Sequence, residues 1–147
     1  MKAVEWLDRG LSHDDPMDCF TNCWIGFNNL YSNYPADSER SSIKNFVDAN
    51  VTESVAEELI NLHNEEISYF ISQAVINMSN TEQNTQRDIN SYNISESFIA
   101  KLKSILMMTY QVRCNVIHGS KSPNRERDVE LCRYSWPFIA ELVDRYA

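Results

Sequence analysis

Few positions in this chain can form a tight turn, because its 147 residues include only 3 Gly and 4 Pro. An all-β fold needs many such turns and is disfavoured, so long helices are expected. The length fits a single domain covering residues 1–147. A domain of this size buries roughly 70% of the surface that its unfolded chain exposes, so it needs no disulfide or metal to fold.

Apolar residues recur at helical spacing along most of the chain. The clearest stripe follows a helix-start signal at Asp15 and Pro16. Its members are spaced by three and four residues: Met17, Phe20, Trp24, Phe27 and Tyr31. Further helical patterns cover the segments 38–50, 52–62, 67–78, 95–118 and 123–146. The prediction is an all-α, antiparallel bundle of four to six helices.

Three positions interrupt this pattern. The stretch 79–93 is rich in Asn, Ser and Thr and nearly free of core residues, so a polar surface loop is expected there. Pro137 falls inside the last helical pattern, where it removes one backbone hydrogen bond and predicts a kink or a break. The apolar spacing leaves open whether a break occurs near His63 and Asn64.

The net charge of −8 argues against a protein coated in positive charge for sequence-independent nucleic-acid binding. The charge is unevenly divided, with a net of −11 over residues 1–100 and +3 over residues 101–147. A site for a polyanion is therefore expected in the last third of the chain.

No apolar run approaches the ~20 residues of a membrane span, and the N-terminal segment lacks the apolar stretch of a secretory signal. A cytoplasmic location without membrane contact is expected. The four cysteines, Cys19, Cys23, Cys114 and Cys132, are interpreted as buried thiols, since neither a secretory context nor a C-x-x-C spacing accompanies them. A zinc site that uses Cys19, Cys23 and a histidine is the alternative.

His118 is the histidine best suited to chemistry, because it stands at a predicted helix end together with Arg113. The motifs of phosphate-binding loops, zinc peptidases, serine hydrolases and zinc deaminases do not occur in the sequence. At about 100° per residue, Arg113 and His118 are roughly 140° apart around a regular helix, whereas Gln111, Asn115 and His118 share one polar stripe. In the alternative interpretation, Arg113 caps the helix C-terminus or pairs with an N-terminal carboxylate, and His118 is a helix-end residue that the helix dipole favours.

The segment 112–121 resembles the R-x4-6-H motif of the HEPN superfamily (higher eukaryotes and prokaryotes nucleotide-binding), with four residues between Arg113 and His118. The segment 20–31, which reads FTNCWIGFNNLY, is similar to the W-x-x-F-N-x-L-Y first helix of many bacterial members. The stretch between these two anchors matches no signature.

This resemblance implies a metal-independent endoribonuclease without a cofactor, commonly a toxin or a phage-defence effector, that acts as a homodimer. Histidine moves protons near neutral pH, which suits His118 for cleaving RNA through attack by its own 2′-OH. The permanent charge of Arg113 suits stabilisation of the negative transition state. A site shared by two subunits would bring these residues together. An antitoxin or another regulatory protein is a further expected partner.

Other residues are predicted to support the site. Asn115 or Gln111 would assist Arg113, because Cys114 stands where many members have a polar residue directly after the arginine. The same departure leaves an inactive site open. Asn28 is expected to hydrogen-bond across to the helix of the motif.

Three basic residues are candidates for guiding RNA: Lys121, Arg125 and Arg127. Arg125 and Arg127 alternate with Glu126 and Asp128, which equally fits a solvated, salt-bridged helix face. Two alternatives to a nuclease remain. One is a catalytically inactive module of the same fold that binds RNA, a nucleotide or a protein partner. The other is a structural protein whose acidic first two-thirds docks a basic partner.

Overall fold

A computed structural model describes residues 2–80, 82–117 and 126–147. The described residues form eight helices: α1 (Lys2–Leu11), α2 (Pro16–Tyr31), α3 (Glu39–Asn50), α4 (Glu53–Leu62), α5 (Asn64–Ser72), α6 (Gln86–Ile94), α7 (Phe98–Ile117) and α8 (Glu126–Tyr146). The only β pairing within these residues is an isolated bridge between Ile76 and Asn84. The predicted all-α class is confirmed, with more helices than the four to six expected.

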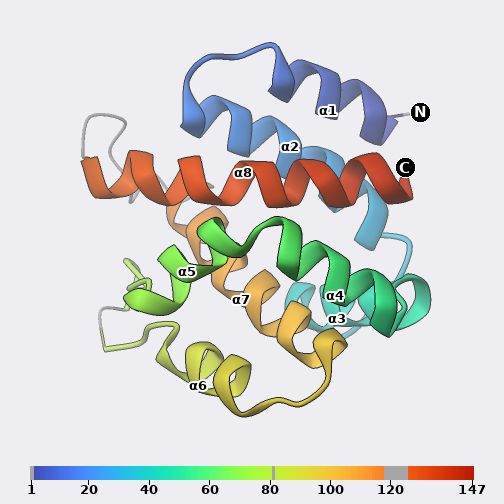
Figure 1. The fold of residues 1–147 in the computed structure, drawn as a ribbon. Helices are drawn as coiled ribbons and strands as arrows, with labels where there is room; N and C mark the ends of the chain where they lie inside the picture. The colour runs from blue at the N-terminus through green and yellow to red at the C-terminus, as the bar shows by residue number, and fades with distance from the viewer. Residues whose placement is uncertain (1, 81, 118–125) are drawn as a thin grey trace.

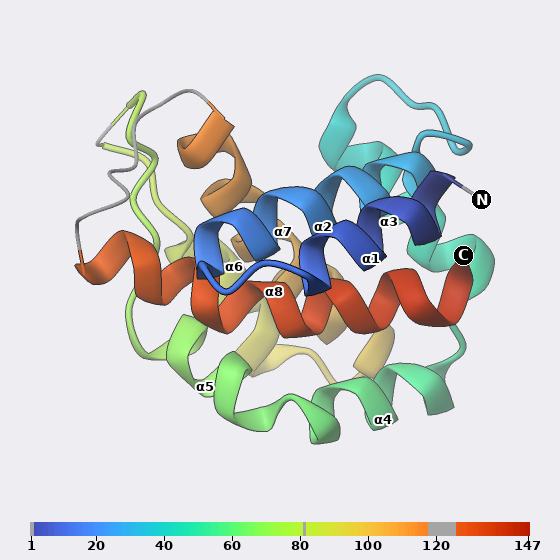
Figure 2. The same ribbon diagram turned by 90° about the horizontal axis from the view of Figure 1, so that it is seen from above.

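The helices pack in two groups on either side of α8. Figures 1 and 2 both show α1 and α2 along one side of α8, with α4 and α5 along the other. α1 and α2 run in opposite directions as a hairpin, whereas α2 and α8 lie side by side and run in the same direction. The bundle is therefore not antiparallel throughout.

α7 is the helix with the most neighbours, and it contacts α2, α3, α4, α5, α6 and α8. Its apolar residues are buried on several faces, including Leu102, Leu106 and Val112, as expected for a helix surrounded by others. The carboxylate of Glu53 at the start of α4 accepts hydrogen bonds from the first backbone N–H groups of α7, at Phe98 (3.1 Å) and Ile99 (2.8 Å). A neighbouring helix thus satisfies donors at the α7 N-terminus.

Three helix starts follow local capping rules. Asp15 accepts hydrogen bonds from the backbone N–H groups of Met17 and Asp18, and Pro16 is the first residue of α2. Ser38 and Thr52 cap α3 and α4 in the same way. These caps satisfy backbone donors that a helix leaves unpaired, and each contributes about 1 kcal/mol. The three helix starts predicted from these residues are confirmed.

Two glycines let α1 and α2 approach closely. A methyl group at Gly10 would lie 2.7 Å from the sulfur of Cys23, and one at Gly26 would lie 2.9 Å from the carbonyl oxygen of Ala3. In the aromatic stripe of α2, every member from Phe20 onward is buried in the core, and Met17 is partly buried. The interpretation of the stripe as core is confirmed.

The segment predicted as a loop over 79–93 contains α6, so that prediction is wrong from Gln86 onward. A single fully apolar side chain, Ile89 at 4% exposure, anchors α6 against the core. A helix that buries one such residue has no apolar periodicity for the sequence to reveal. The segment 74–78 was expected to continue a helix, yet α5 ends at Ser72. The chain instead pairs with the residues before α6, where Val75 N–H donates to the Thr85 hydroxyl at 2.7 Å.

The structure answers the two questions about helix continuity that the sequence raised at Pro137 and at His63. α8 continues through Pro137, so the predicted break does not occur. The carbonyl that loses its partner belongs to Arg133, an exposed residue, where solvent can satisfy it. His63 separates α4 from α5 and contacts Glu66 at 3.3 Å, which resolves the question of a break.

Cys19, Cys23 and Cys132 are buried and Cys114 is half-buried. Burial raises the pKa of Cys23 to about 12, which favours a protonated thiol. No group of three or more metal-ligating side chains gathers among the residues that the structure describes. In the same part of the chain, no helix is both long enough and apolar enough to cross a membrane.

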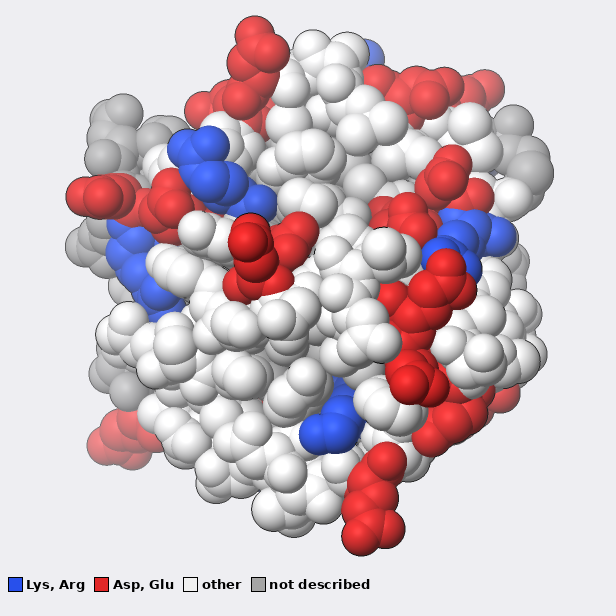
Figure 3. Space-filling model, viewed as in Figure 1, with Lys and Arg blue, Asp and Glu red and all other residues white. Residues whose placement is uncertain are grey.

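Acidic side chains are scattered over the face formed by α8, α4 and α5, and basic side chains form only small separate clusters there (Figure 3). This distribution agrees with the net charge of −8. The view of this face shows no broad basic surface of the kind that sequence-independent binding of nucleic acid requires.

Candidate functional site

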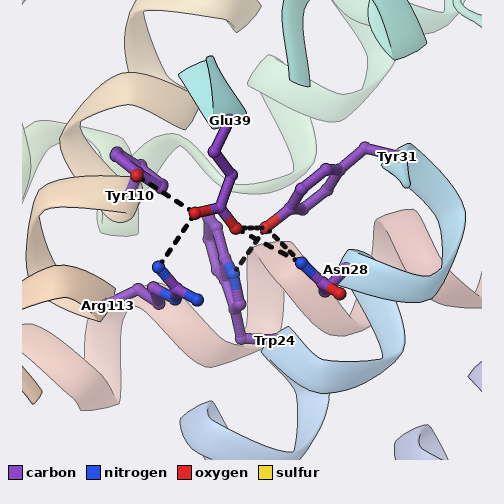
Figure 4. Close-up of polar contacts among 6 residues, drawn as sticks. All are labelled: Trp24, Asn28, Tyr31, Glu39, Tyr110 and Arg113. Atoms are coloured by element: carbon purple, nitrogen blue, oxygen red, sulfur yellow. Dashed lines mark hydrogen bonds and ion pairs between the residues drawn. The ribbon is translucent and has the colours of Figure 1, made fainter. Parts of the chain in front are cut away.

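Arg113 is fixed by a carboxylate from a distant part of the chain. Its Nη1 donates to Oε1 of Glu39, the first residue of α3, at 3.0 Å. Tyr110, one turn earlier on α7, donates its hydroxyl to the same oxygen at 3.1 Å. Figure 4 shows Glu39 pointing between these two side chains. The carboxylate therefore sets the orientation of the guanidinium.

The second oxygen of Glu39 is held from α2. Tyr31 donates its hydroxyl to Oε2, and Asn28 donates its amide to the same oxygen at 3.3 Å and to the Tyr31 hydroxyl at 2.8 Å. Trp24 donates its indole N–H to Tyr31 at 3.2 Å. Polar groups from α2, α3 and α7 thus form one network, which we call the Glu39 network: Trp24, Asn28, Tyr31, Glu39, Tyr110 and Arg113.

Asn28 was predicted to bond directly to the helix of the motif. Its amide instead reaches Tyr31 and Glu39, and the link to α7 passes through the Glu39 carboxylate. The Glu39 side chain, which enters from α3, therefore carries the connection between α2 and Arg113.

Electrostatics in this network favour a charged Arg113. Burial alone would lower the pKa of Arg113. The negative charge of Glu39 is the largest of the effects that raise it, and the net result is a raised pKa. The pKa of Tyr31 and that of Tyr110 are raised chiefly by burial, with Glu39 adding to the effect, so both phenols remain protonated donors.

One donor of Arg113 has no partner. The Nε atom is buried and makes no hydrogen bond within the described residues, while the side chain as a whole is 20% exposed. A buried donor without a partner costs about 1–3 kcal/mol, and such groups often occur where function requires them.

Arg113 lines a pocket of about 200 Å³ between α2 and the last turn of α7. The pocket wall is largely apolar, with Phe20, Trp24 and Ile117 among its residues, and Asn28 adds an amide. Sites for complete small ligands span about 300–1,000 Å³, so this pocket fits part of a larger ligand that continues into solvent.

Gln111 and Asn115 lie elsewhere. The Asn115 side chain is 2% exposed, accepts from Met78 N–H at 3.0 Å and donates to the carbonyl of Ile76 at 2.8 Å. Gln111 donates to Asn115 at 3.1 Å. The structure does not bring either residue to Arg113; both help to hold the segment 76–78 against α7.

His118, Lys121 and Arg125 lie outside the described residues, so the pairing of Arg113 with His118 stays a prediction. Arg127 was considered part of a solvated face, yet it donates to the carbonyl of Gln73 at 3.4 Å and lies 4.8 Å from the centre of the Tyr69 ring. Asp128 is 1% exposed, so the expected solvated face does not extend to it.

Glu39 is the functional candidate that the sequence did not reveal. It follows Ser38 directly, and an acidic residue in a first helical turn is common because it interacts well with the helix dipole. Nothing in its local sequence distinguishes it from Glu53, which also begins a helix. Comparison of the chain with protein-family models, with curated proteins and with solved structures finds no match.

Proposed function

We propose that this protein is a metal-independent endoribonuclease of the HEPN type, with Arg113 and His118 as its catalytic residues. The observation that carries the proposal is the guanidinium of Arg113, which the partly buried carboxylate of Glu39 holds beside a pocket at the end of α7. The motif histidine follows that helix directly, at the residue after Ile117. A fixed cation next to a titratable imidazole is the pair that this chemistry needs.

The proposed reaction is a transesterification within the RNA strand. The imidazole of His118 takes the proton of a ribose 2′-OH, whose oxygen attacks the adjacent phosphorus. The bond to the 5′-oxygen breaks and that oxygen receives a proton, which leaves a 2′,3′-cyclic phosphate and a 5′-hydroxyl. Arg113 stabilises the negative charge on the phosphorus centre through its remaining N–H donors.

We propose a homodimer for the active protein, with the site near the subunit interface. The resemblance of the segment 112–121 to the HEPN motif supports this arrangement, because that resemblance implies a homodimer with the Arg-His pairs near the interface. The cytoplasm, where RNA is abundant, is the proposed location, with an antitoxin or another regulatory protein as a further partner.

The test is cleavage of a labelled RNA pool by the wild type and by the variants Arg113→Ala and His118→Ala. Each variant is expected to lose at least about 10³-fold of the activity, because each removes an interaction with the transition state. Addition of EDTA is expected to leave the wild-type rate unchanged, and the products are expected to carry cyclic phosphates. Circular dichroism and size measurements serve as controls for fold and dimer. Full activity of His118→Ala would overturn the proposal.

A silent binding module is the second candidate. The observation that favours it is the ion pair itself, since Glu39 offsets part of the charge that Arg113 would offer to a phosphate. Growth of cells after induced expression separates the two candidates. Growth arrest that disappears in His118→Ala supports the nuclease, and RNA binding without any arrest or cleavage supports the module.

A further inference from the structure

A second, larger hollow lies beside α7 and does not include Arg113 among its lining residues. It is a groove of about 1,000 Å³ lined by α3, α6, α7 and the segment before α6. Polar side chains dominate its wall, including the hydroxyl groups of Thr85, Ser91 and Ser104 and the amide of Gln111. We call it the α3/α6/α7 groove.

Four basic residues line this groove: Arg40, Lys44, Arg87 and Lys103. Residues 1–100 contain only five basic residues, and three of those five are in this group. Charges that are far apart along an acidic chain therefore meet on one surface. Two acidic residues, Glu82 and Asp88, line the same groove, so its wall keeps an excess of positive charge.

Two of the four cations are available to a ligand. Lys103 forms an ion pair with Asp48, and Arg40 lies over the Tyr110 ring. Lys44 and Arg87 are exposed, and neither forms an ion pair within the described part of the chain. Burial raises the pKa of the nearby Asp88, and the positive charges of Arg40, Lys44 and Arg87 oppose this rise.

Arg40, which lines the groove, lies close to the Glu39 network. Its guanidinium lies 4.9 Å from the centre of the Tyr110 ring, and that of Arg113 lies 5.8 Å from the same centre. Arg40 also directly follows Glu39 at the start of α3. One arginine of the groove and the arginine of the candidate site therefore lie beside the same aromatic ring.

The chemistry of the wall favours RNA over an acidic peptide. Phosphates bind to Lys and Arg, while base amino groups donate to carboxylates such as Asp88 and Glu82. The side chains of an acidic peptide offer only acceptors, and the two carboxylates would repel them. The volume is at the upper limit of small-molecule sites, which accommodates a few nucleotides of one strand.

We propose that the α3/α6/α7 groove binds the backbone of a single RNA strand and leads it to the Arg113 site, with Lys44 and Arg87 as its phosphate contacts. The identity of the ligand as RNA rests on the proposed function. The binding itself does not require cleavage, so the two proposals can fail separately.

The test measures fluorescence anisotropy of a labelled single-stranded RNA with 2′-O-methyl groups, which cannot be cleaved through the 2′-oxygen. The double variant Lys44→Gln with Arg87→Gln is expected to bind about tenfold more weakly than the wild type at moderate salt. The slope of log affinity against log salt is expected to fall by about 1.4, since each lost contact with a single strand contributes about 0.7.

The double variant Lys2→Gln with Arg9→Gln is the matched control, because it removes the same charge from exposed positions on α1. It is expected to bind RNA like the wild type. Equal losses in both double variants would overturn the groove as a specific site, as would unchanged binding in the groove variant. Equally tight binding of a polyglutamate peptide would overturn RNA as the ligand.

Cleavage assays on the same proteins separate this inference from the proposed function. If the wild type binds RNA through the groove but does not cut it, the groove proposal is supported and the nuclease proposal is refuted. A wild type that cuts RNA through His118, with binding unaffected by the groove variant, retains the nuclease and refutes the groove.

Discussion

Arg113 and Asn115 are two residues apart on α7, yet their side chains are used in different ways. Asn115 is buried and its amide oxygen and nitrogen both have backbone partners in the segment 76–78. Arg113 is partly exposed and borders a pocket, and one of its buried donors has no partner among the residues that the structure describes. Hydrogen bonding, rather than residue type or spacing, separates a residue that stabilises the fold from one that is available to a ligand.

This contrast corrects the role that the sequence suggested for the polar stripe of Gln111 and Asn115, which was to assist Arg113. Gln111 and Asn115 share a helix face, as their spacing requires, but that face meets the segment before α6. Arg113 lies on another face of α7 and is joined by residues from α2 and α3. The support that was expected from Asn115 comes from Glu39 instead, and three predictions test this difference.

The largest effect is expected for Glu39→Gln. The change removes the charge that orients Arg113, and misplacement of a group by about 1 Å costs about 10²-fold in rate. The value of kcat for RNA cleavage is expected to fall by that factor, with little change in KM. Glu57→Gln, an exposed position on α4, is the matched control. A wild-type kcat in Glu39→Gln would show that the carboxylate does not position Arg113.

Asn115→Ala is expected to lower stability rather than activity. The variant leaves the Met78 N–H, the Ile76 carbonyl and the Gln111 amide without their partner, at a cost of about 2–3 kcal/mol. Thermal unfolding followed by circular dichroism should show Tm lower by about 5–10 °C. Cleavage well below this temperature should remain close to that of the wild type. A selective loss of cleavage with unchanged Tm would assign Asn115 to the site.

The smallest effect is expected at alkaline pH. The folded protein raises the pKa of Tyr110 above the value of about 10 that applies to the unfolded chain. The folded state therefore keeps a proton that the unfolded chain releases, so this contribution to stability is complete below pH 10 and is lost as the pH rises further. Unfolding measured between pH 9 and 11 should show a shallower decline in Tyr110→Phe. Identical slopes in the two proteins would contradict a raised pKa.

The helices were predictable where local chemistry decides them. The start of α2 at Asp15 and Pro16, its aromatic stripe and the caps Ser38 and Thr52 depend on neighbours within one or two turns. α6 was missed because its stability comes from packing against α7, through Ile89, rather than from its own composition. The end of α5 at Ser72 was missed because Thr85 and Asn115, which hold the segment 74–78, lie outside that segment.

The candidate site was only partly predictable for the same reason. The sequence singled out Arg113, and tertiary contacts then added Glu39, which is 74 positions earlier in the chain. The distribution of charge along the sequence predicted a polyanion site in the last third of the chain. The groove instead collects Arg40, Lys44 and Arg87 from the acidic part, since folding brings α3 and α6 to the same helix, α7.

The sequence by itself determined that this protein is helical, where α2, α3 and α4 begin, and which apolar stripe enters the core. These properties depend on hydrogen bonds and side-chain contacts between residues three or four positions apart. Tertiary structure alone decided which polar residues of α7 are consumed by the fold, which carboxylate orients Arg113, and where positive charge gathers. Those outcomes depend on Coulomb interactions and hydrogen bonds between distant segments, which the order of residues along the chain does not specify.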